Sequence, residues 1–123
     1  MTALRDFEVE AIRILAGGEL SPAALDAILK APELSRYEYT GCGYFATVAV
    51  LLELPEPVTL CEPHVTGALG ETVCGFVLHL RGDEVTLECE PCCGPDAAPD
   101  FRDGAVVVAS EPGNVIDLRQ AAT

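Results

Sequence analysis

The sequence predicts an α+β fold, with an N-terminal αα-hairpin packed on one face of a mainly antiparallel sheet of about five or six strands. Two observations support this class. Helical periodicity is confined to the first 30 residues. From Leu34 onward the apolar residues follow the twofold period of strands, and Gly and Pro separate these segments. Helices that precede a run of strands are typical of α+β proteins.

The first helix is predicted over about residues 3–16, where Leu4, Phe7, Ala11, Ile12 and Leu15 share one face. Thr2 is placed to cap its first turn, and Gly17 and Gly18 end it. The second helix is predicted over about 21–30. Ser21-Pro22 is a typical start signal, and Pro32 excludes helical geometry at the residue before it.

Six strands are predicted from period and composition. Tyr37 and Tyr39 alternate with charged residues, and Gly41-Cys-Gly43 predicts a tight turn into the apolar run that follows. The segment around Arg81-Gly-Asp83 predicts a second hairpin, with Val85, Leu87 and Cys89 directed inward. The predicted ranges are about 35–40, 44–53, 58–60, 72–80, 84–90 and 105–109.

Residues 91–104 are predicted to be a loop, and Val115 to Leu118 could add an edge strand. The 123 residues suit one domain spanning 1–123. A chain of this length buries about two-thirds of its unfolded surface, so it needs no disulfide or metal to fold.

The charge of the chain narrows its partners. Acidic residues outnumber basic ones 20 to 7, giving a formal charge of −13. Such a chain repels phosphate backbones and anionic lipid, so we expect no nucleic-acid and no membrane binding. It attracts a basic protein, although the same charge also serves solubility alone. The N-terminus has acids where a signal peptide has bases, so a cytoplasmic location is predicted.

Two short cysteine motifs make a zinc site the main alternative to a binding protein. Cys61-Glu-Pro-His64 and Cys89-Glu-Pro-Cys92 each place two soft ligands at the spacing of a zinc turn. Cys61, His64, Cys89 and Cys92 would form a Cys₃His set. Against this, Cys89 falls on the inward face of its predicted strand, where a buried thiol is common. Two unrelated loops that each carry cysteine remain the other interpretation.

Aromatic residues gather near the predicted Gly41–Gly43 turn. Tyr37, Tyr39, Tyr44 and Phe45, surrounded by acids, suit a contact surface for a basic protein or for a second copy of the chain. The alternative is that these rings belong to the core. Nothing in the sequence identifies an enzyme: no serine nucleophile elbow and no phosphate loop is present.

The segment Arg36-x-x-x-Thr40-Gly41-x-Gly43-Tyr44-Phe45, followed by Gly75-Phe76-Val77-Leu78 and an acidic hairpin, resembles a group of small uncharacterised bacterial proteins. Their common pattern is a Thr-Gly-x-Gly-aromatic-Phe segment and a later Gly-Phe strand. The resemblance covers roughly residues 34–90. The resemblance implies a shared fold but does not point to any activity. The pattern of the group has no cysteines at the positions of Cys61, Cys89 and Cys92. The function predicted is that of a small acidic, non-enzymatic binding or protein-interaction domain, immunity-like or regulatory.

Overall fold

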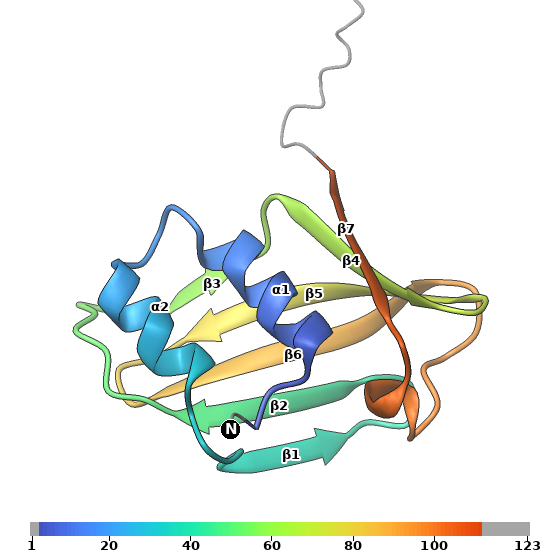
Figure 1. Cartoon of the computed structure of the whole chain (residues 1–123), viewed down its shortest axis with the longest axis horizontal. Helices are drawn as coiled ribbons and strands as arrows, with labels where there is room; N and C mark the ends of the chain where they lie inside the picture. Colours follow the sequence, from blue (N-terminus) through green and yellow to red (C-terminus); the bar gives the residue numbers. More distant parts are fainter. Residues whose placement is uncertain (1–2, 112–123) are drawn as a thin grey trace, which may run out of the picture.

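The computed structural model describes residues 3–111. Two helices, seven strands and a short 3₁₀ helix make up this part of the chain (Figure 1). Their bounds in chain order are α1 Asp6–Ala16, α2 Pro22–Leu29, β1 Arg36–Tyr39, β2 Tyr44–Ala49, β3 Val58–Leu60, β4 His64–Leu69, β5 Thr72–Leu80, β6 Glu84–Cys93, η1 Phe101–Asp103 and β7 Val107–Glu111.

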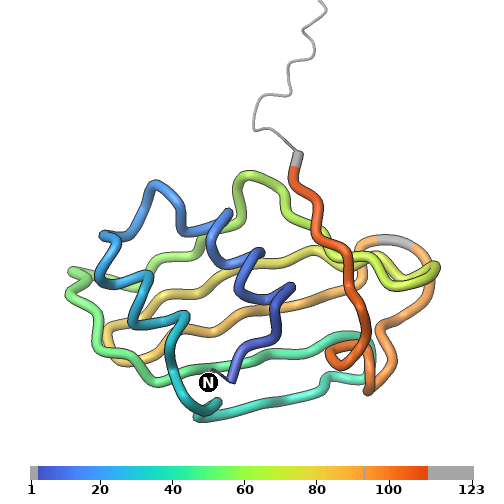
Figure 2. The backbone as a smooth tube through the Cα atoms, viewed as in Figure 1, coloured from blue at the N-terminus to red at the C-terminus, as the bar shows by residue number. Residues whose placement is uncertain are grey.

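The α+β class predicted from the sequence is confirmed. One antiparallel sheet has the order β1-β2-β6-β5-β4-β7, and β3 pairs with β5 beyond the end of β4. Both helices lie on the same side of this sheet, in front of it in Figure 1. The tube in Figure 2 shows how β4 and β7 curl toward α1, which contacts β4, β5 and β7. The opposite face of the sheet has no helix over it in the described part of the chain.

Helix α1 begins later than predicted. Arg5 is its N-cap, and the Glu8 carboxylate accepts the Arg5 backbone N–H at 2.8 Å. Thr2, the predicted cap, lies outside the described residues. Helix α2 starts as predicted: the Ser21 hydroxyl accepts the Ala24 N–H at 3.1 Å, and Pro22 is the first helical residue.

The core lies between the helices and the inner face of the sheet. Every apolar residue predicted on the buried face of the first helix is buried, and so are Val85, Leu87 and Cys89. Phe7 joins the layers, with its ring 6.0 Å from Phe76 of β5 and 6.1 Å from Phe101 of η1. The predicted direction of the β6 side chains is therefore confirmed.

The sequence analysis missed β4, which makes the seventh strand. Its residues pair with both β5 and β7, although Gly67 lowers the strand propensity of the segment. Gly67 is needed there because a Cβ would lie 2.8 Å from the Phe76 ring. Three further boundaries differ: β2 ends at Ala49, β6 continues to Cys93, and β7 is Val107–Glu111 rather than 105–109. The predicted strand Val115 to Leu118 lies outside the described residues.

The predicted loop over 91–104 is anchored to the core. Ala97 and Phe101 within it are buried. The Tyr39 hydroxyl donates to the Ala97 carbonyl at 2.7 Å, and the Ala97 N–H donates to the Cys42 carbonyl at 2.9 Å. The segment thereby returns the chain from β6 to the helix side of the sheet. Within residues 3–111, no helix has the length and apolar character needed to cross a membrane.

Candidate functional site

The face of the sheet opposite the helices carries two adjoining hollows. The larger has a volume of about 450 Å³ and crosses β1, β2, β6 and β5. Antiparallel pairing brings these side chains together, since Thr47 lies opposite both Arg36 and Thr86. Its lining residues are Arg36, Glu38, Phe45, Thr47, His79, Arg81, Thr86 and Glu88.

Polar contacts hold the floor of the larger hollow in place. The hydroxyls of Thr47 and Thr86 are 2.8 Å apart. His79 is held between two strands, with Nε2 2.7 Å from a Glu88 carboxylate oxygen and Nδ1 3.3 Å from the Thr59 hydroxyl. Such cross-strand contacts hold these side chains in fixed positions on the sheet.

The smaller hollow has a volume of about 170 Å³ and continues the first across β5 and β6. The two share Glu88. Its walls come from the break between β3 and β4 and from the second half of β6. The lining residues are Cys61, His64, Gly75, Phe76, Val77, Glu88, Glu90, Pro91 and Cys92.

Glu88 and Glu90 form an interacting carboxyl pair on this face. A hydrogen bond with Glu88 and repulsion by its charge raise the pKa of Glu90. Burial by itself raises the pKa of Glu88, but hydrogen bonds from Glu90 and His79 outweigh it and lower that pKa. The two carboxylates therefore repel each other when both are charged, and a bound cation would relieve that repulsion.

The four predicted zinc ligands are divided between the two faces of the sheet. Cys61, His64 and Cys92 line the smaller hollow, whereas Cys89 is fully buried on the helix side. Cys89 pairs in register with Tyr44 and Phe76, both core residues, so strand alternation places it away from the hollow. Among the residues described, no group of three or more His, Cys, Asp or Glu is arranged to hold a metal ion.

We expect the cysteines to differ sharply in reactivity toward an alkylating reagent. Cys61 and Cys92 are exposed, so both should be labelled within the first minutes at neutral pH. Cys74 and Cys89 are fully buried, and a hydrogen bond with Cys74 together with burial raises the pKa of the Cys89 thiol. Both should stay unlabelled until the protein is unfolded. Peptide mapping by mass spectrometry measures each site; early labelling of Cys89 would contradict its buried position.

The four predicted aromatic contact residues do not form one exposed surface. Tyr44 is only 2 % exposed, because it is packed under the helix layer on the inner face. Tyr37 and Tyr39 share that face at the sheet edge, and the Tyr37 ring lies 5.5 Å from the Tyr44 ring. Phe45 alternates to the opposite face, where it lines the larger hollow. Only Phe45 of the four therefore belongs to the candidate site.

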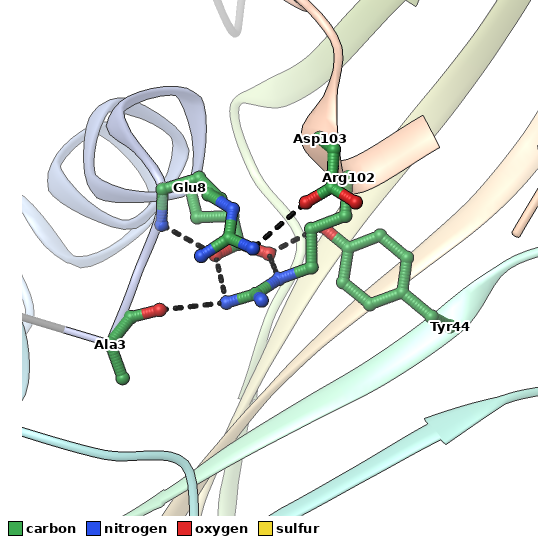
Figure 3. A network of polar contacts seen from close by, with 6 residues as sticks. Ala3, Glu8, Tyr44, Arg102 and Asp103 are labelled. Atoms are coloured by element: carbon green, nitrogen blue, oxygen red, sulfur yellow. Dashed lines mark hydrogen bonds and ion pairs between the residues drawn. The ribbon is translucent and has the colours of Figure 1, made fainter. Parts of the chain in front are cut away.

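A buried polar cluster at the start of α1 was not predicted (Figure 3). Glu8 is fully buried and accepts hydrogen bonds from Arg102 at 2.6 and 2.8 Å. The Tyr44 hydroxyl donates to it at 2.6 Å, and Arg102 also donates to the Ala3 carbonyl at 2.9 Å. Burial and the adjacent Glu8 raise the pKa of Tyr44.

Several donors already occupy the Glu8 carboxylate, so the cluster fits a role in joining α1 to the 91–104 segment. Burial alone lowers the pKa of Arg102, but hydrogen bonds and the charge of Glu8 outweigh it and raise that pKa. A sequence signal for Glu8 exists: it lies four residues after Leu4 and four before Ile12, on the buried face of the helix.

Comparison of the chain with protein-family models, curated proteins and solved structures found no match.

Proposed function

We propose that this chain is a non-enzymatic protein-interaction domain that binds a basic protein segment on the face of its sheet opposite the helices. The observation that carries the proposal is the pair of adjoining hollows on that face, which share Glu88. Together their lining residues form one depression that extends from β1 to the start of β4, room enough for a peptide segment.

Glu38, Glu88 and Glu90 line the depression against Arg36 and Arg81, which leaves an excess of negative charge that favours a cationic segment. Glu38 and Glu90 are exposed there, and the chain as a whole carries a formal charge of −13. Arg36 is paired with Glu84, the closest atoms being 3.2 Å apart, so part of the positive charge on this face is already neutralised. Long-range attraction would speed encounter with a basic partner, and local contacts would set the register.

Phe45 supplies an apolar contact in the same depression. It lines the larger hollow beside Thr47 and Glu38. An aromatic side chain surrounded by polar groups is typical of the residues that dominate binding energy at protein interfaces. The predicted aromatic surface is thereby reduced to one ring on a different face from the other three.

Reversing one charge on this face should weaken binding of a basic peptide. For a peptide that alternates arginine and serine, we expect Glu38→Lys to raise the dissociation constant about fivefold at low salt. Glu10→Lys, on the exposed side of α1, changes the net charge equally and serves as the matched control. Isothermal titration calorimetry measures both, and an acidic peptide should not bind.

Two outcomes would contradict this proposal. Equal weakening by Glu38→Lys and Glu10→Lys would mean that the peptide responds only to net charge. Concentration-dependent dimerisation of the chain alone, with amide chemical shifts confined to the same face, would make a second copy the occupant. Support requires shifts at residues lining the hollows and a larger loss in Glu38→Lys than in Glu10→Lys.

A further inference from the structure

Gly75 lies in the middle of β5, on the face opposite the helices, beneath the smaller hollow. Glycine weakens a strand interior and often marks a place where a ligand approaches the backbone closely. Packing requires glycine at Gly43 and Gly67, where a Cβ would collide with the Cys89 carbonyl and the Phe76 ring. At Gly75 a Cβ would meet its nearest atom, His64 Nε2, at an ordinary 3.6 Å. Neither packing nor a positive φ requires glycine here, and its lack of a side chain leaves the backbone bare beneath the hollow.

The walls of the hollow combine apolar and anionic surface. Val77 and Pro91 line it beside the bare backbone of Gly75, and Glu88 and Glu90 line it from β6. In the described structure no Lys or Arg is among its lining residues. A side chain with an alkyl stem and a cationic head matches this combination, because the stem packs on apolar surface and the head meets carboxylates.

The size of the hollow limits the occupant to a single side chain. Pockets for drug-sized ligands have volumes of about 300–1,000 Å³, whereas this one holds about 170 Å³. It adjoins the larger hollow, with which it shares the lining residue Glu88, so a peptide lying in the larger hollow is close enough to direct one side chain toward it.

We propose that the hollow over Gly75 binds one arginine or lysine side chain of the basic partner, with its cation between Glu88 and Glu90. This assignment rests on the proposed function. It adds the site at which the domain would recognise one particular side chain of its partner. The partner segment then lies across β6, β2 and β1, with Phe45 contacting its remaining residues.

Filling the hollow from its floor tests the assignment. Gly75→Val places two methyl groups in the space and improves strand propensity, so the fold should persist. Ala49→Val adds a β-branched side chain on the same face of β2, where Ala49 is exposed and lines neither hollow. For the arginine–serine peptide we expect Gly75→Val to weaken binding about tenfold and Ala49→Val to leave it unchanged. Thermal unfolding of both variants checks that each is folded.

Thiol protection gives a second readout that does not depend on a variant. Cys61 and Cys92 line the hollow, whereas Cys42, in the turn between β1 and β2, lines neither hollow. Saturating peptide should slow alkylation of Cys61 and Cys92 several-fold and leave Cys42 unaffected. A peptide in which every arginine is replaced by neutral citrulline should protect none of the three.

The outcomes separate this assignment from the proposed function. Equal peptide affinity in Gly75→Val and wild type, without protection of Cys61, would overturn the assignment of a side-chain site to the hollow. The face would still stand as a binding surface. No peptide binding to wild type would overturn both. Tight binding of Zn²⁺ alone that is lost in Gly75→Val and in Cys61→Ser would assign the hollow to a metal ion instead.

Discussion

Replacing Arg102 with methionine is expected to lower the free energy of unfolding by about 3–5 kcal/mol, because the Glu8 carboxylate would stay buried without its cation. Arg102 and Glu8 are joined by two hydrogen bonds, and their side chains are 10 % and 0 % exposed. Methionine preserves much of the side-chain volume, so the loss measures the unpaired charge rather than a cavity. Urea unfolding followed by circular dichroism gives the difference.

Two further variants make this expectation sharper. Arg5→Met removes a pair of similar length, Arg5–Asp103 at 2.8 Å, but both partners are exposed, so the expected loss is about 0–1 kcal/mol. The double variant Glu8→Met with Arg102→Met should be more stable than Arg102→Met alone, since no charge then remains buried. A loss below about 1 kcal/mol in Arg102→Met would show that the pair is not desolvated as described.

Phe101→Ala is the second substitution with a large expected effect, a loss of about 3–5 kcal/mol. Phe101 is 2 % exposed, and its ring stands edge-on to Phe7 at 6.1 Å between centroids. Truncation leaves a cavity between η1 and α1 and removes the aromatic contact. The same unfolding experiment measures the change.

Leu51→Ala is the matched control for the Phe101 experiment. Leu51 is 87 % exposed, so its truncation should change the free energy of unfolding by less than about 0.5 kcal/mol. A similarly small effect at Phe101 would contradict the anchoring of the 91–104 segment in the core. The segment would then be the surface loop that its composition predicts.

Periodicity predicted most of the fold because α1 and β6 each have one side that faces the core. Leu4, Phe7 and Ile12 carry the helical period, and Val85 and Leu87 carry the strand period. The pattern fails in β4, where Gly67 is set by contact with Phe76 from a neighbouring strand. It fails again over 91–104, where turn-forming residues surround one buried ring, that of Phe101. The structure of β4 and of the 91–104 segment depends on packing against distant parts of the chain. The local sequence pattern carries no information about that packing.

The candidate site was predicted only in part. Phe45, Cys61, His64 and Cys92 line the hollows, but the sequence assigned them to two separate functions. Register explains the difference, because only the pairing of β5 with β6 reveals that Gly75 lies opposite Glu90. Alternation along one strand gives the face of a residue, whereas the neighbours across the sheet depend on pairing that one segment does not specify.

The contact between Glu8 and Arg102 joins positions 94 residues apart, which affects how the protein forms during translation. The 11 residues of α1 leave the ribosome before Arg102, and an isolated helix shorter than about 12–15 residues is marginal in water. The nascent helix therefore has no buried cation for Glu8 until Arg102 has emerged. Until then its apolar side stays available to chaperones, and an N-terminal fragment released before that point should aggregate.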